Sequence, residues 1–269
     1  MTTKSLTNDQ LNQLYTHGYT IVQNAIPMDL VRSAKKAINR SLGQGVASEQ
    51  VEKNNHSSWC SELKKEECIL DLYYKSNIIS ILESAIGKNN LDKVKSGQIA
   101  LRFPYHDEIG IRKPHIDGFH TPLNGVPKDK IMSFTCMVGV CLSNQKEDYM
   151  GNLVVYPGSH HIVAEKFKQQ YDINGATYGP GYGNWNKGLL YPPGTLYSKI
   201  EPKQILVGVG DLIICHYCLL HCFAHNTSSE IRYNIYFRIR HKDHPEDGRV
   251  EARSECWLEW EELKKKLSR

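Results

Sequence analysis

The apolar residues of the first 96 positions recur at the spacing of helices. Residues 7–10, T-N-D-Q, fit a capping box, which predicts that a short helix begins there. The stretch 18–27, GYTIVQNAIP, is strand-like and leads into a second helix that is expected to end near Gly43. A third helix is expected to stop at Gly87. This part of the chain is therefore predicted to be a mostly helical buttress over 1–96.

Beyond residue 97 the apolar pattern shortens to that of strands. Five runs rich in β-branched and aromatic residues are separated by Gly, Pro, Asn and Asp. They are QIALRFP, IMSFTCMVGVCL, GNLVVYPGSH, QILVGVGDLIICH and RYNIYFRIR. Short strands after a helical preface predict a mainly β core over 97–241, closed or built of two sheets, with flanking α-helices.

A long loop over 174–195 interrupts the predicted core. It is rich in glycine, proline and aromatic residues, and loops of this length inside a compact domain are usually functional or disordered. Tyr178, Tyr182 and Trp185 are candidate substrate contacts if the loop is a lid. If the loop is a surface insertion, the same aromatics would pin it to the core, and the sequence leaves both readings open.

The last segment, SECWLEWEELKKKLSR, has the pattern of an amphipathic helix over 254–267. Its acidic residues come early and its lysines late, as the helix dipole prefers. The apolar face of this expected packing helix consists of Trp257, Trp260, Leu263 and Leu267. A chain of 269 residues with this organisation is expected to form a single domain, 1–269.

Composition narrows the class of partner. Hydrophobic residues make up 40% and charged residues 23%, as in an ordinary globular protein, and the net charge of +4 comes without a dense basic stripe. Nucleic acid is therefore not expected as a partner. No run approaches the roughly 18 apolar residues that span a bilayer, and the amino terminus lacks the apolar core of a signal peptide. The eight cysteines are expected to be reduced thiols of a cytoplasmic protein, although an organelle address stays open.

The candidate chemistry starts at IRKPHIDGFH, residues 111–120. His115 and Asp117 are two positions apart, so in an extended segment their side chains lie on one face and offer a nitrogen and an oxygen ligand. His221 could supply a second imidazole and complete the two-His-one-carboxylate set that binds non-haem Fe(II) with open positions. Taken alone, the H-x-D pair is a weak signal, because a surface pair or a histidine oriented by its neighbour is the more common arrangement.

Arg232 follows His221 by eleven positions (232 − 221 = 11), beyond a polar turn. It is expected to begin a strand antiparallel to the one that ends near His221. Its guanidinium fork matches a carboxylate, so a pocket that holds it is expected to bind an anion. The polar face of this strand is predicted to look into a pocket and the apolar face onto helices. The polar face consists of Arg232, Asn234, Tyr236 and Arg238.

Other histidines and thiols offer alternatives. His216 and His225 compete with His221 as ligands, and His160 and His161 in GSHH are expected at the rim of a loop. A structural zinc site is a further alternative; its ligands would come from Cys215, His216, Cys218, His221 and Cys222. The remaining cysteines provide no C-x-x-C partner, so most of these thiols are expected to fill the core.

Four segments together resemble the phytanoyl-CoA dioxygenase family of Fe(II)- and 2-oxoglutarate-dependent oxygenases. They are LTNDQLNQLYTHGYTIVQNAIP, KPHIDGFH, GNLVVYPGSH, and GDLIICHYCLLH followed by NTSSEIR, in the order and at the spacing of the family. The resemblance runs through most of the chain. It implies a double-stranded β-helix, or jelly-roll, core with flanking helices.

Carried over residue by residue, the resemblance makes His115, Asp117 and His221 the iron ligands. It makes Arg232 the anchor for the distal carboxylate of 2-oxoglutarate, and only His221 has the family's interval to Arg232. The implied activity is oxidation, most simply hydroxylation, of a small molecule with O2, releasing succinate and CO2, with ascorbate supportive. Related halogenases lack the carboxylate, so Asp117 favours hydroxylation over halogenation. The runner-up reading is a catalytically silent jelly-roll binding protein.

Two positions depart from the family pattern or extend it. Family members often place a small hydroxyl residue two positions after the distal histidine, where this chain has Phe223. Strand alternation suggests that Gln98 or Arg102 supplies the missing polar contact to 2-oxoglutarate. Phe119 and His120, directly after the H-x-D pair, are further candidate substrate contacts. The substrate and the oligomeric state are not indicated by the sequence.

Overall fold

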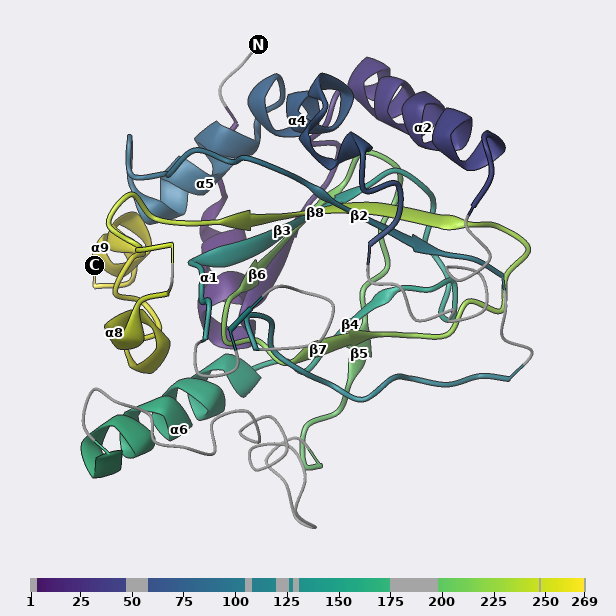
Figure 1. The fold of residues 1–269 in the computed structure, drawn as a ribbon. Coiled ribbons are helices and arrows are strands. Elements are labelled where there is room, and N and C mark those ends of the chain that lie inside the picture. The colour runs from purple at the N-terminus through teal and green to yellow at the C-terminus, as the bar shows by residue number, and fades with distance from the viewer. Residues whose placement is uncertain are drawn as a thin grey trace.

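The computed structural model describes residues 4–46, 58–104, 108–119, 126–127, 131–174, 198–246 and 248–268. Two antiparallel sheets face each other, with helices on the outer side of the larger one (Figure 1). The five-stranded sheet has the order β1-β6-β3-β8-β2 and the three-stranded sheet the order β5-β4-β7. A mainly β core with flanking helices was predicted from the sequence, and this part of the prediction is confirmed.

The strands of the larger sheet are β1 (Tyr19–Val22), β2 (Gln98–Arg102), β3 (Cys136–Cys141), β6 (Leu212–His216) and β8 (Arg232–Ile239). Those of the smaller sheet are β4 (Leu153–Val155), β5 (Lys203–Gln204) and β7 (His221–Phe223). The helices are α1 (Asn8–His17), α2 (Met28–Gly43), α4 (Glu67–Tyr74), α5 (Ile78–Ile86), α6 (Ser159–Asn174), α8 (Val250–Ser254) and α9 (Glu261–Leu267), with a 3-10 turn η1 (Leu63–Lys65).

The two faces of β8 divide the interior in the way that strand alternation predicts. Tyr233, Ile235, Phe237 and Ile239 enter an apolar cluster with the buried residues of α1, α2, α4 and α5. In Figure 1, α2, α4 and α5 lie along this side of the sheet. The opposite face turns toward the smaller sheet, where Tyr236 belongs to a second apolar cluster that includes residues of β3, β4, β6 and α6. The space between the sheets is therefore where inward-facing polar side chains meet.

The connection between the two sheets corrects one expectation. His221 was expected near the end of the strand that begins at Leu212, with Arg232 on the strand beside it. In the structure β6 ends at His216, the chain turns, and His221 opens β7 in the other sheet. Arg232 opens β8, which pairs with β2 and β3 instead. The two residues consequently approach one interior space from opposite sheets.

The predicted helices are present, and one more is found in the first third of the chain. The capping box of α1 has both reciprocal bonds, from the Gln10 backbone N–H to the Thr7 side chain and from the Thr7 N–H to the Gln10 side chain. Gly18 ends the helix with a left-handed φ of 79°. The additional helix is α4, which was not predicted because its eight residues are too few for a helical pattern to repeat.

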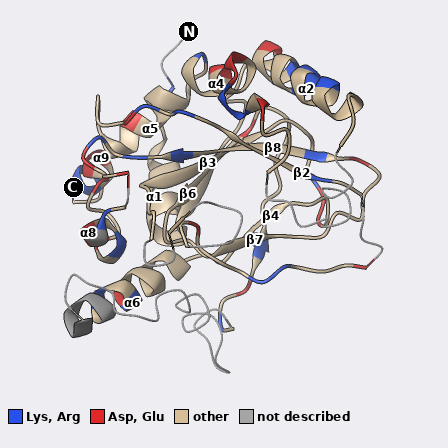
Figure 2. Ribbon diagram, viewed as in Figure 1, with Lys and Arg blue, Asp and Glu red and all other residues tan. Residues whose placement is uncertain are grey.

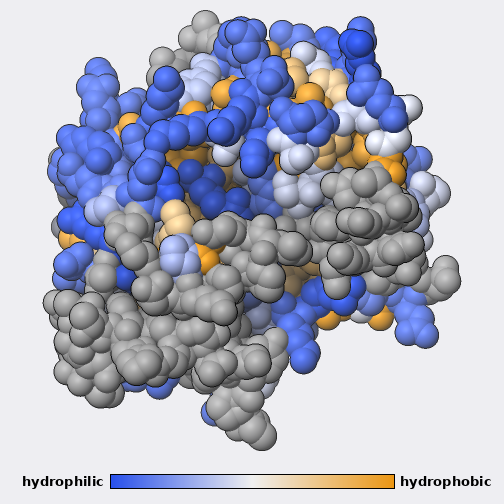
Figure 3. All heavy atoms as spheres, in the orientation of Figure 1, coloured by the Kyte–Doolittle hydropathy of each residue, from blue (hydrophilic) through white to orange (hydrophobic). Residues whose placement is uncertain are grey.

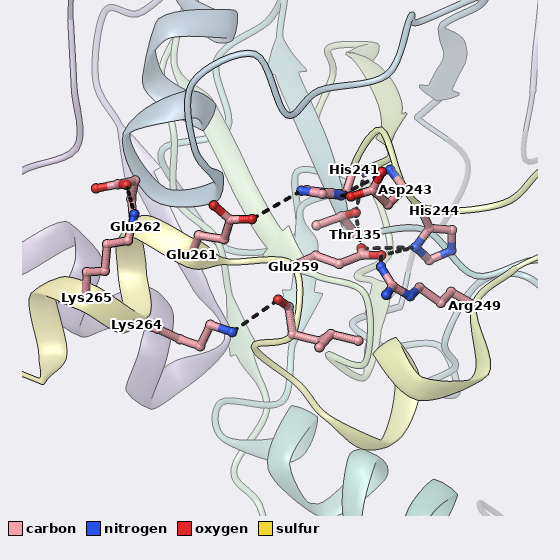
Figure 4. Close-up of polar contacts among 11 residues, drawn as sticks. Thr135, His241, Asp243, His244, Arg249, Glu259, Glu261, Glu262, Lys264 and Lys265 are labelled. Atoms are coloured by element: carbon pink, nitrogen blue, oxygen red, sulfur yellow. Dashed lines mark hydrogen bonds and ion pairs between the residues drawn. The ribbon is translucent and has the colours of Figure 1, made fainter.

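The prediction of one C-terminal helix over 254–267 is wrong in the extent of the helix. The helical residues are α8 and α9, and the chain turns between Ser254 and Glu261. Figure 4 shows Glu259 in the segment between the two helices, where its carboxylate accepts hydrogen bonds from Thr135, His244 and Arg249. Trp260 and Leu263 are nevertheless buried in the first apolar cluster.

His160 and His161 were expected at the rim of a loop, and this is also wrong. They lie in the first turn of α6, with the His160 side chain fully buried against Trp257 and His216. Helix α6 was not predicted, since its hydrophobic pattern is weak. The proposed loop 174–195 lies outside the described residues beyond Asn174, which ends α6.

The surface carries both signs of charge. Lysine and arginine are interspersed with aspartate and glutamate over most of the ribbon, with several basic residues along α2 (Figure 2). Hydrophilic residues cover much of the described surface on the face drawn in Figure 3, and hydrophobic ones appear in small areas between them. Among the described helices, none is long and apolar enough to cross a membrane.

Candidate metal centre

The site begins with a backbone contact between two distant histidines. His115 and His221 form an isolated antiparallel bridge: the His115 N–H donates to the His221 carbonyl (2.9 Å), and the His221 N–H donates to the His115 carbonyl (3.0 Å). The ring centroids are 4.7 Å apart. The H-x-D segment is thus held at the edge of β7 although it is not itself a regular strand. This pairing fixes the separation of two potential nitrogen ligands.

Asp117 completes the cluster. Its Oδ1 lies 3.6 Å from Nε2 of His115 and 3.8 Å from Nε2 of His221. One ligand atom from each of the three residues lies within 4.8 Å of the other two, and no other such group of three His, Cys, Asp or Glu occurs among the described residues. The three side chains predicted as ligands are therefore brought together with their donor atoms facing one point.

The cluster is open on one side. The side chain of His221 is 10% exposed and that of Asp117 16%, whereas His115 is 44% exposed. A small molecule would therefore approach from the side of His115, with His221 at the inner end. Gly118 follows Asp117 with a φ of +89°, and a Cβ placed on it would lie 2.5 Å from the Met132 carbonyl oxygen. Only glycine lets the chain leave the cluster along this path.

The tautomer of His221 is set by a hydrogen bond to the backbone two residues before it. Its Nδ1 lies 2.9 Å from the Leu219 carbonyl oxygen and can only donate to it, which leaves the Nε2 lone pair for the cluster. Burial, with the neighbouring His115, lowers the pKa of His221 to about 4, so the imidazole is neutral at physiological pH. A neutral imidazole is the form that binds a metal ion.

Arg238 holds the carboxylate of Asp117. Its Nη2 and Nε donate to Oδ2 of Asp117 at 2.7 and 3.1 Å, so Oδ1 remains directed at the imidazoles. Burial alone would raise the pKa of the Asp117 carboxyl, but Arg238 and the two histidines outweigh it and hold this pKa well below its usual range. Strand alternation placed Arg238 on the inward face of β8, but its pairing with Asp117 was not predicted.

Arg232 is buried at the other end of the same strand. It is 2% exposed; its Nε donates to the Gly151 carbonyl (2.8 Å) and its Nη1 to the Ala100 carbonyl (3.0 Å). No carboxylate among the described residues forms a salt bridge with it. Burial lowers the pKa of its guanidinium. A cation held in this way by carbonyl oxygens is positioned for an anion that the described residues do not supply.

Arg102 stands directly opposite Arg232 on β2, on the same inward face. Its guanidinium carbon lies 3.7 Å from the centre of the Phe223 ring, so the aromatic ring of Phe223 serves as a stacking surface for Arg102. Burial and the charge of Arg232 lower the pKa of Arg102 to about 9. Gln98 lies on the same face, opposite Tyr236. Like charges directly opposite on neighbouring strands repel each other, which favours an anion bound beside them.

Phe223 connects the cluster of His115, Asp117 and His221 to Arg102 and Arg232. Phe223 follows His221 by two residues on β7, so it faces the same side roughly 7 Å farther along. Arg102 stacks on that ring, and Arg232 is its cross-strand neighbour. A short dicarboxylate could therefore reach from the cluster to the guanidinium groups.

The wall between the cluster and the guanidinium groups is polar. Gln145 donates to the Asn234 side chain (2.8 Å), and Asn234 donates to the Tyr236 hydroxyl (3.0 Å). All three side chains are buried. These hydrogen bonds satisfy the polar groups of Asn234 and Tyr236, which strand alternation directs inward from β8. They fix the orientation of the three side chains.

The competing ligands lie elsewhere. Both ring nitrogens of His216 are engaged, Nε2 with the Cys256 carbonyl (2.6 Å) and Nδ1 with the Cys218 N–H (3.1 Å). His225 contacts the Glu108 carbonyl through Nδ1 (3.0 Å). The five residues of the zinc alternative do not converge within the described chain, because the single cluster found there is the His–Asp–His group.

Most of the candidate substrate contacts fall outside the described residues. They are His120, Tyr178, Tyr182 and Trp185. The remaining candidate, Phe119, is described and is buried, with 7% of its surface exposed.

The donor set suits a divalent transition metal. Two imidazole nitrogens and one ionised carboxylate oxygen converge, and the side chains come from two segments already fixed by backbone hydrogen bonds. This set, with open positions, is the ligand type of non-haem Fe(II) sites. A closed structural zinc site takes four protein ligands. The three ligands found here therefore fit a non-haem Fe(II) site better than a structural zinc site.

Comparison with known proteins gives the fold. No protein-family model matches the sequence, and no curated protein matches it significantly. Solved structures do match. The non-haem alpha-ketoglutarate-dependent carbocyclase SnoK from nogalamycin biosynthesis is 18% identical, with a TM-score of 0.52 over 89% of this chain and 85% of its own. The chain shares the fold of this structure.

Two further structures contain the small molecules of interest. The epimerase SnoN, in complex with Fe3+, alpha-ketoglutarate and nogalamycin RO, is 15% identical with a TM-score of 0.57, covering 86% of this chain and 82% of its own. HygX from Streptomyces hygroscopicus, with nickel and 2-oxoglutarate bound, is 13% identical with a TM-score of 0.52, covering 90% and 89%. At these identities the likeness establishes the fold, and any activity has to be argued from the site.

Proposed function

We propose that this chain is an Fe(II)- and 2-oxoglutarate-dependent oxygenase, similar to the phytanoyl-CoA dioxygenase family, that oxidises a small molecule. The observation that carries the proposal is the convergence of His115, Asp117 and His221, with both imidazoles joined through the backbone and the carboxylate fixed by Arg238. The two facing sheets are interpreted as the double-stranded β-helix core of such enzymes. Structures of the same fold that hold a metal with 2-oxoglutarate support this reading.

Each residue has a defined part in the proposal. His115, Asp117 and His221 would hold the iron, and Arg232 would anchor the distal carboxylate of 2-oxoglutarate. Bound iron would supply the redox chemistry by which O2 oxidises 2-oxoglutarate to succinate and CO2 while the substrate is oxidised. A charge-assisted hydrogen bond from Arg232 would contribute about 1.5–3 kcal/mol, enough to select a dicarboxylate over a monoacid. Arg102, and Gln98 beside it, would complete the anion site.

The chain's own residues also favour a division of the site between co-substrate and substrate. The anion site lies deep between the sheets and the exposed side of the cluster is at His115, so the co-substrate would occupy the inner end and the substrate the outer one. Phe119, buried beside the H-x-D pair, would contact the substrate, and His120, Tyr178, Tyr182 and Trp185 remain proposed contacts. Asp117 would occupy the coordination position that a halide needs, so the reaction proposed is oxidation, most simply hydroxylation.

The test uses the purified full chain with Fe(II), ascorbate and 2-oxoglutarate. Succinate and CO2 should form slowly without added substrate, and Mn(II) with 2-oxoglutarate should raise the melting temperature. Asp117→Ala should abolish succinate formation while the metal-free protein keeps its fold, and the exposed-carboxylate variant Asp243→Ala should behave as the wild type. No metal binding together with no 2-oxoglutarate-dependent thermal shift would refute the proposal.

Other outcomes separate the alternatives. Metal and 2-oxoglutarate binding without succinate would indicate a silent binding protein, and a tightly held stoichiometric zinc would indicate a structural Cys/His site. The part of the chain that the structure describes shows no dense basic clamp for a large phosphorylated carrier, so a smaller polar or lipid-like substrate is proposed (Figure 2). A thermal-shift screen of metabolites in the presence of Mn(II) and 2-oxoglutarate would identify it.

A further inference from the structure

A second group of reactive side chains lies away from the metal cluster. Cys218 is in the turn between β6 and β7, and Cys256 is in the turn between α8 and α9. His216 lies between the two segments: its Nδ1 accepts from the Cys218 backbone N–H (3.1 Å), and its Nε2 lies 2.6 Å from the Cys256 carbonyl oxygen. The Cys218 sulfur lies 3.6 Å from the Arg253 carbonyl oxygen, and the Cys256 sulfur lies 3.4 Å from the His160 carbonyl oxygen. Two cysteines that are 38 positions apart (256 − 218 = 38) are thus adjacent in space.

The two thiols have unequal surroundings. Cys218 is fully buried, whereas Cys256 is only partly buried, next to the exposed residue His161. The imidazole of His161 hydrogen-bonds the Cys256 thiol, and its Nε2 contacts the Tyr15 carbonyl at 3.1 Å. Cys256 is therefore the more exposed of the two residues and lies beside an imidazole, whereas Cys218 is shielded from solvent.

The charged and titratable groups around Cys256 favour its thiolate. They come from four packed elements: Tyr15 of α1, His160 and His161 of α6, His216 of β6 and Arg253 of α8. The hydrogen bond from Cys218 and the two imidazoles His216 and His161 lower the pKa of Cys256, although burial opposes this. Burial raises the pKa of Cys218.

The other cysteines lack such an environment. Burial raises the pKa of each of the other six, which are Cys60, Cys68, Cys136, Cys141, Cys215 and Cys222. Thiols of this kind are unreactive. Oxidation-sensitive cysteines are accessible thiolates placed beside a second, resolving thiol. Among the eight cysteines of the chain, Cys256 is the one whose pKa is lowered, and it is a partly exposed residue with Cys218 beside it.

We propose that Cys256 and Cys218 are a thiol-oxidation site, at which a hydroperoxide converts the pair reversibly into a disulfide. The Cys256 thiolate attacks the distal peroxide oxygen, forms an S–O bond and breaks the O–O bond. The alkoxide or hydroxide that leaves takes the proton of the His161 imidazolium. The Cys218 sulfur then attacks the sulfenic sulfur, and the S–OH oxygen leaves as water with the Cys218 proton. Two electrons pass from the two thiols to the peroxide.

The disulfide would connect the β6–β7 turn to the α8–α9 turn. Cys218 precedes Leu219, whose carbonyl accepts the hydrogen bond from His221 Nδ1, so the bond would tie the turn behind this imidazole to the C-terminal segment. The oxidation itself requires no metal. It is therefore independent of the proposed oxygenase activity and can be tested in a metal-free protein.

The experiment treats the purified full chain with equimolar hydrogen peroxide in the presence of a metal chelator. Free thiols are then blocked, and the digested peptides are analysed by mass spectrometry. A cross-linked peptide pair that contains residues 218 and 256, the loss of two titratable thiols and recovery of both with dithiothreitol are expected. A cross-link between other cysteines, or unchanged thiols at 218 and 256 while Cys68 is oxidised, would overturn the proposal.

Variants assign the two roles. Cys256→Ser should remove the cross-link, and Cys218→Ser should leave a sulfenic acid on residue 256 that dimedone traps. If Cys218→Ser fails to fold, Cys218→Ala serves the same purpose, and the wild-type peptide map remains decisive. His161→Gln should slow the oxidation of Cys256 on the order of tenfold. The matched control Cys68→Ser, at another partly buried thiol, should cross-link like the wild type.

Discussion

Arg238 directs two hydrogen-bond donors at a single oxygen of Asp117, and the other oxygen of that carboxylate faces two imidazoles. The two functions of the carboxylate are thus divided between its two oxygens. Oδ2 is held by β8, and Oδ1 is left as a single ligand atom. The orientation of a ligating carboxylate is commonly set by an outer partner of this kind. Arg238 is therefore a positioning residue in the proposed site.

Replacing Arg238 should weaken metal binding. In Arg238→Gln the carboxylate can rotate and its pKa is no longer held down by a cation, so we expect Mn(II) affinity to fall by about 10–100-fold. Electron paramagnetic resonance of free Mn(II) during a titration measures this directly. Arg240→Gln, two residues farther along and in contact with the Glu246 carbonyl, is the matched control. Equal affinity in both variants would show that Arg238 has no positioning role.

Arg232 should control the affinity for 2-oxoglutarate. Arg232→Lys keeps a positive charge but removes the fork that binds a carboxylate at two points. Because the second charge-assisted hydrogen bond would be worth about 1.5–3 kcal/mol, KM for 2-oxoglutarate should rise roughly 10- to 150-fold, with a smaller change in kcat. Succinate formation measured against 2-oxoglutarate concentration tests this. The lysine variant is preferable to an apolar one because the Gly151 and Ala100 carbonyls also need a donor. An unchanged KM would place the co-substrate elsewhere.

Gly118 should not tolerate a side chain. In Gly118→Ala the φ of +89° becomes strained and the new Cβ meets the Met132 carbonyl oxygen at 2.5 Å. We expect a loss of about 1–3 kcal/mol in the free energy of unfolding, and weaker metal binding because Asp117 is displaced. Urea denaturation measures the first effect. The control Gly43→Ala lies in α2 with open space around the position and should be neutral or stabilising.

The Glu259 cluster should make stability depend on acid pH. Burial alone would raise the pKa of the Glu259 carboxyl, but hydrogen bonds from His244, Thr135 and Arg249 outweigh it and lower this pKa (Figure 4). The folded state therefore binds the proton more weakly than the unfolded chain. The stabilisation is complete above the ordinary pKa of about 4.5 and is lost as the pH falls through the lower, folded-state value.

Glu259→Gln should accordingly flatten this acid dependence. We expect it to cost about 1–3 kcal/mol in the free energy of unfolding at neutral pH, because buried donors lose an ionic acceptor. Urea titrations between neutral and acid pH measure both effects. Glu261→Gln, whose carboxylate is 48% exposed and 4.0 Å from His241, should change stability by less than about 1 kcal/mol. A wild-type acid limb in Glu259→Gln would contradict the prediction.

Local periodicity accounts for what the sequence could predict about the fold. The Thr7 capping box, the α2 and α5 faces and the two-sided pattern of β8 are short-range signals, and the structure bears them out. The breaks between elements depend on distant contacts. The expected C-terminal helix is interrupted between Ser254 and Glu261, where Thr135 and His244 hold the Glu259 carboxylate from other segments of the chain. No pattern within the segment indicates this.

The candidate site divides in the same way. Spacing and residue type singled out His115, Asp117 and His221, and the structure brings their donor atoms together. The sheet to which each residue belongs could not be predicted, since β7 is only three residues long and has no period of its own. The contact between Arg238 and Asp117 was not predictable either. It joins residues 121 positions apart, and only the tertiary fold brings them together.

The backbone bridge between His115 and His221 also has a kinetic consequence. It closes a loop of 106 residues (221 − 115 = 106), so its formation requires two distant segments of the chain to meet, at an entropic cost that local contacts do not carry. A metal ion would find both imidazoles in place only in the completed protein. Metal binding would then stabilise the folded state by mass action. Retention of the metal would report whether the segments of His115 and His221 are still paired.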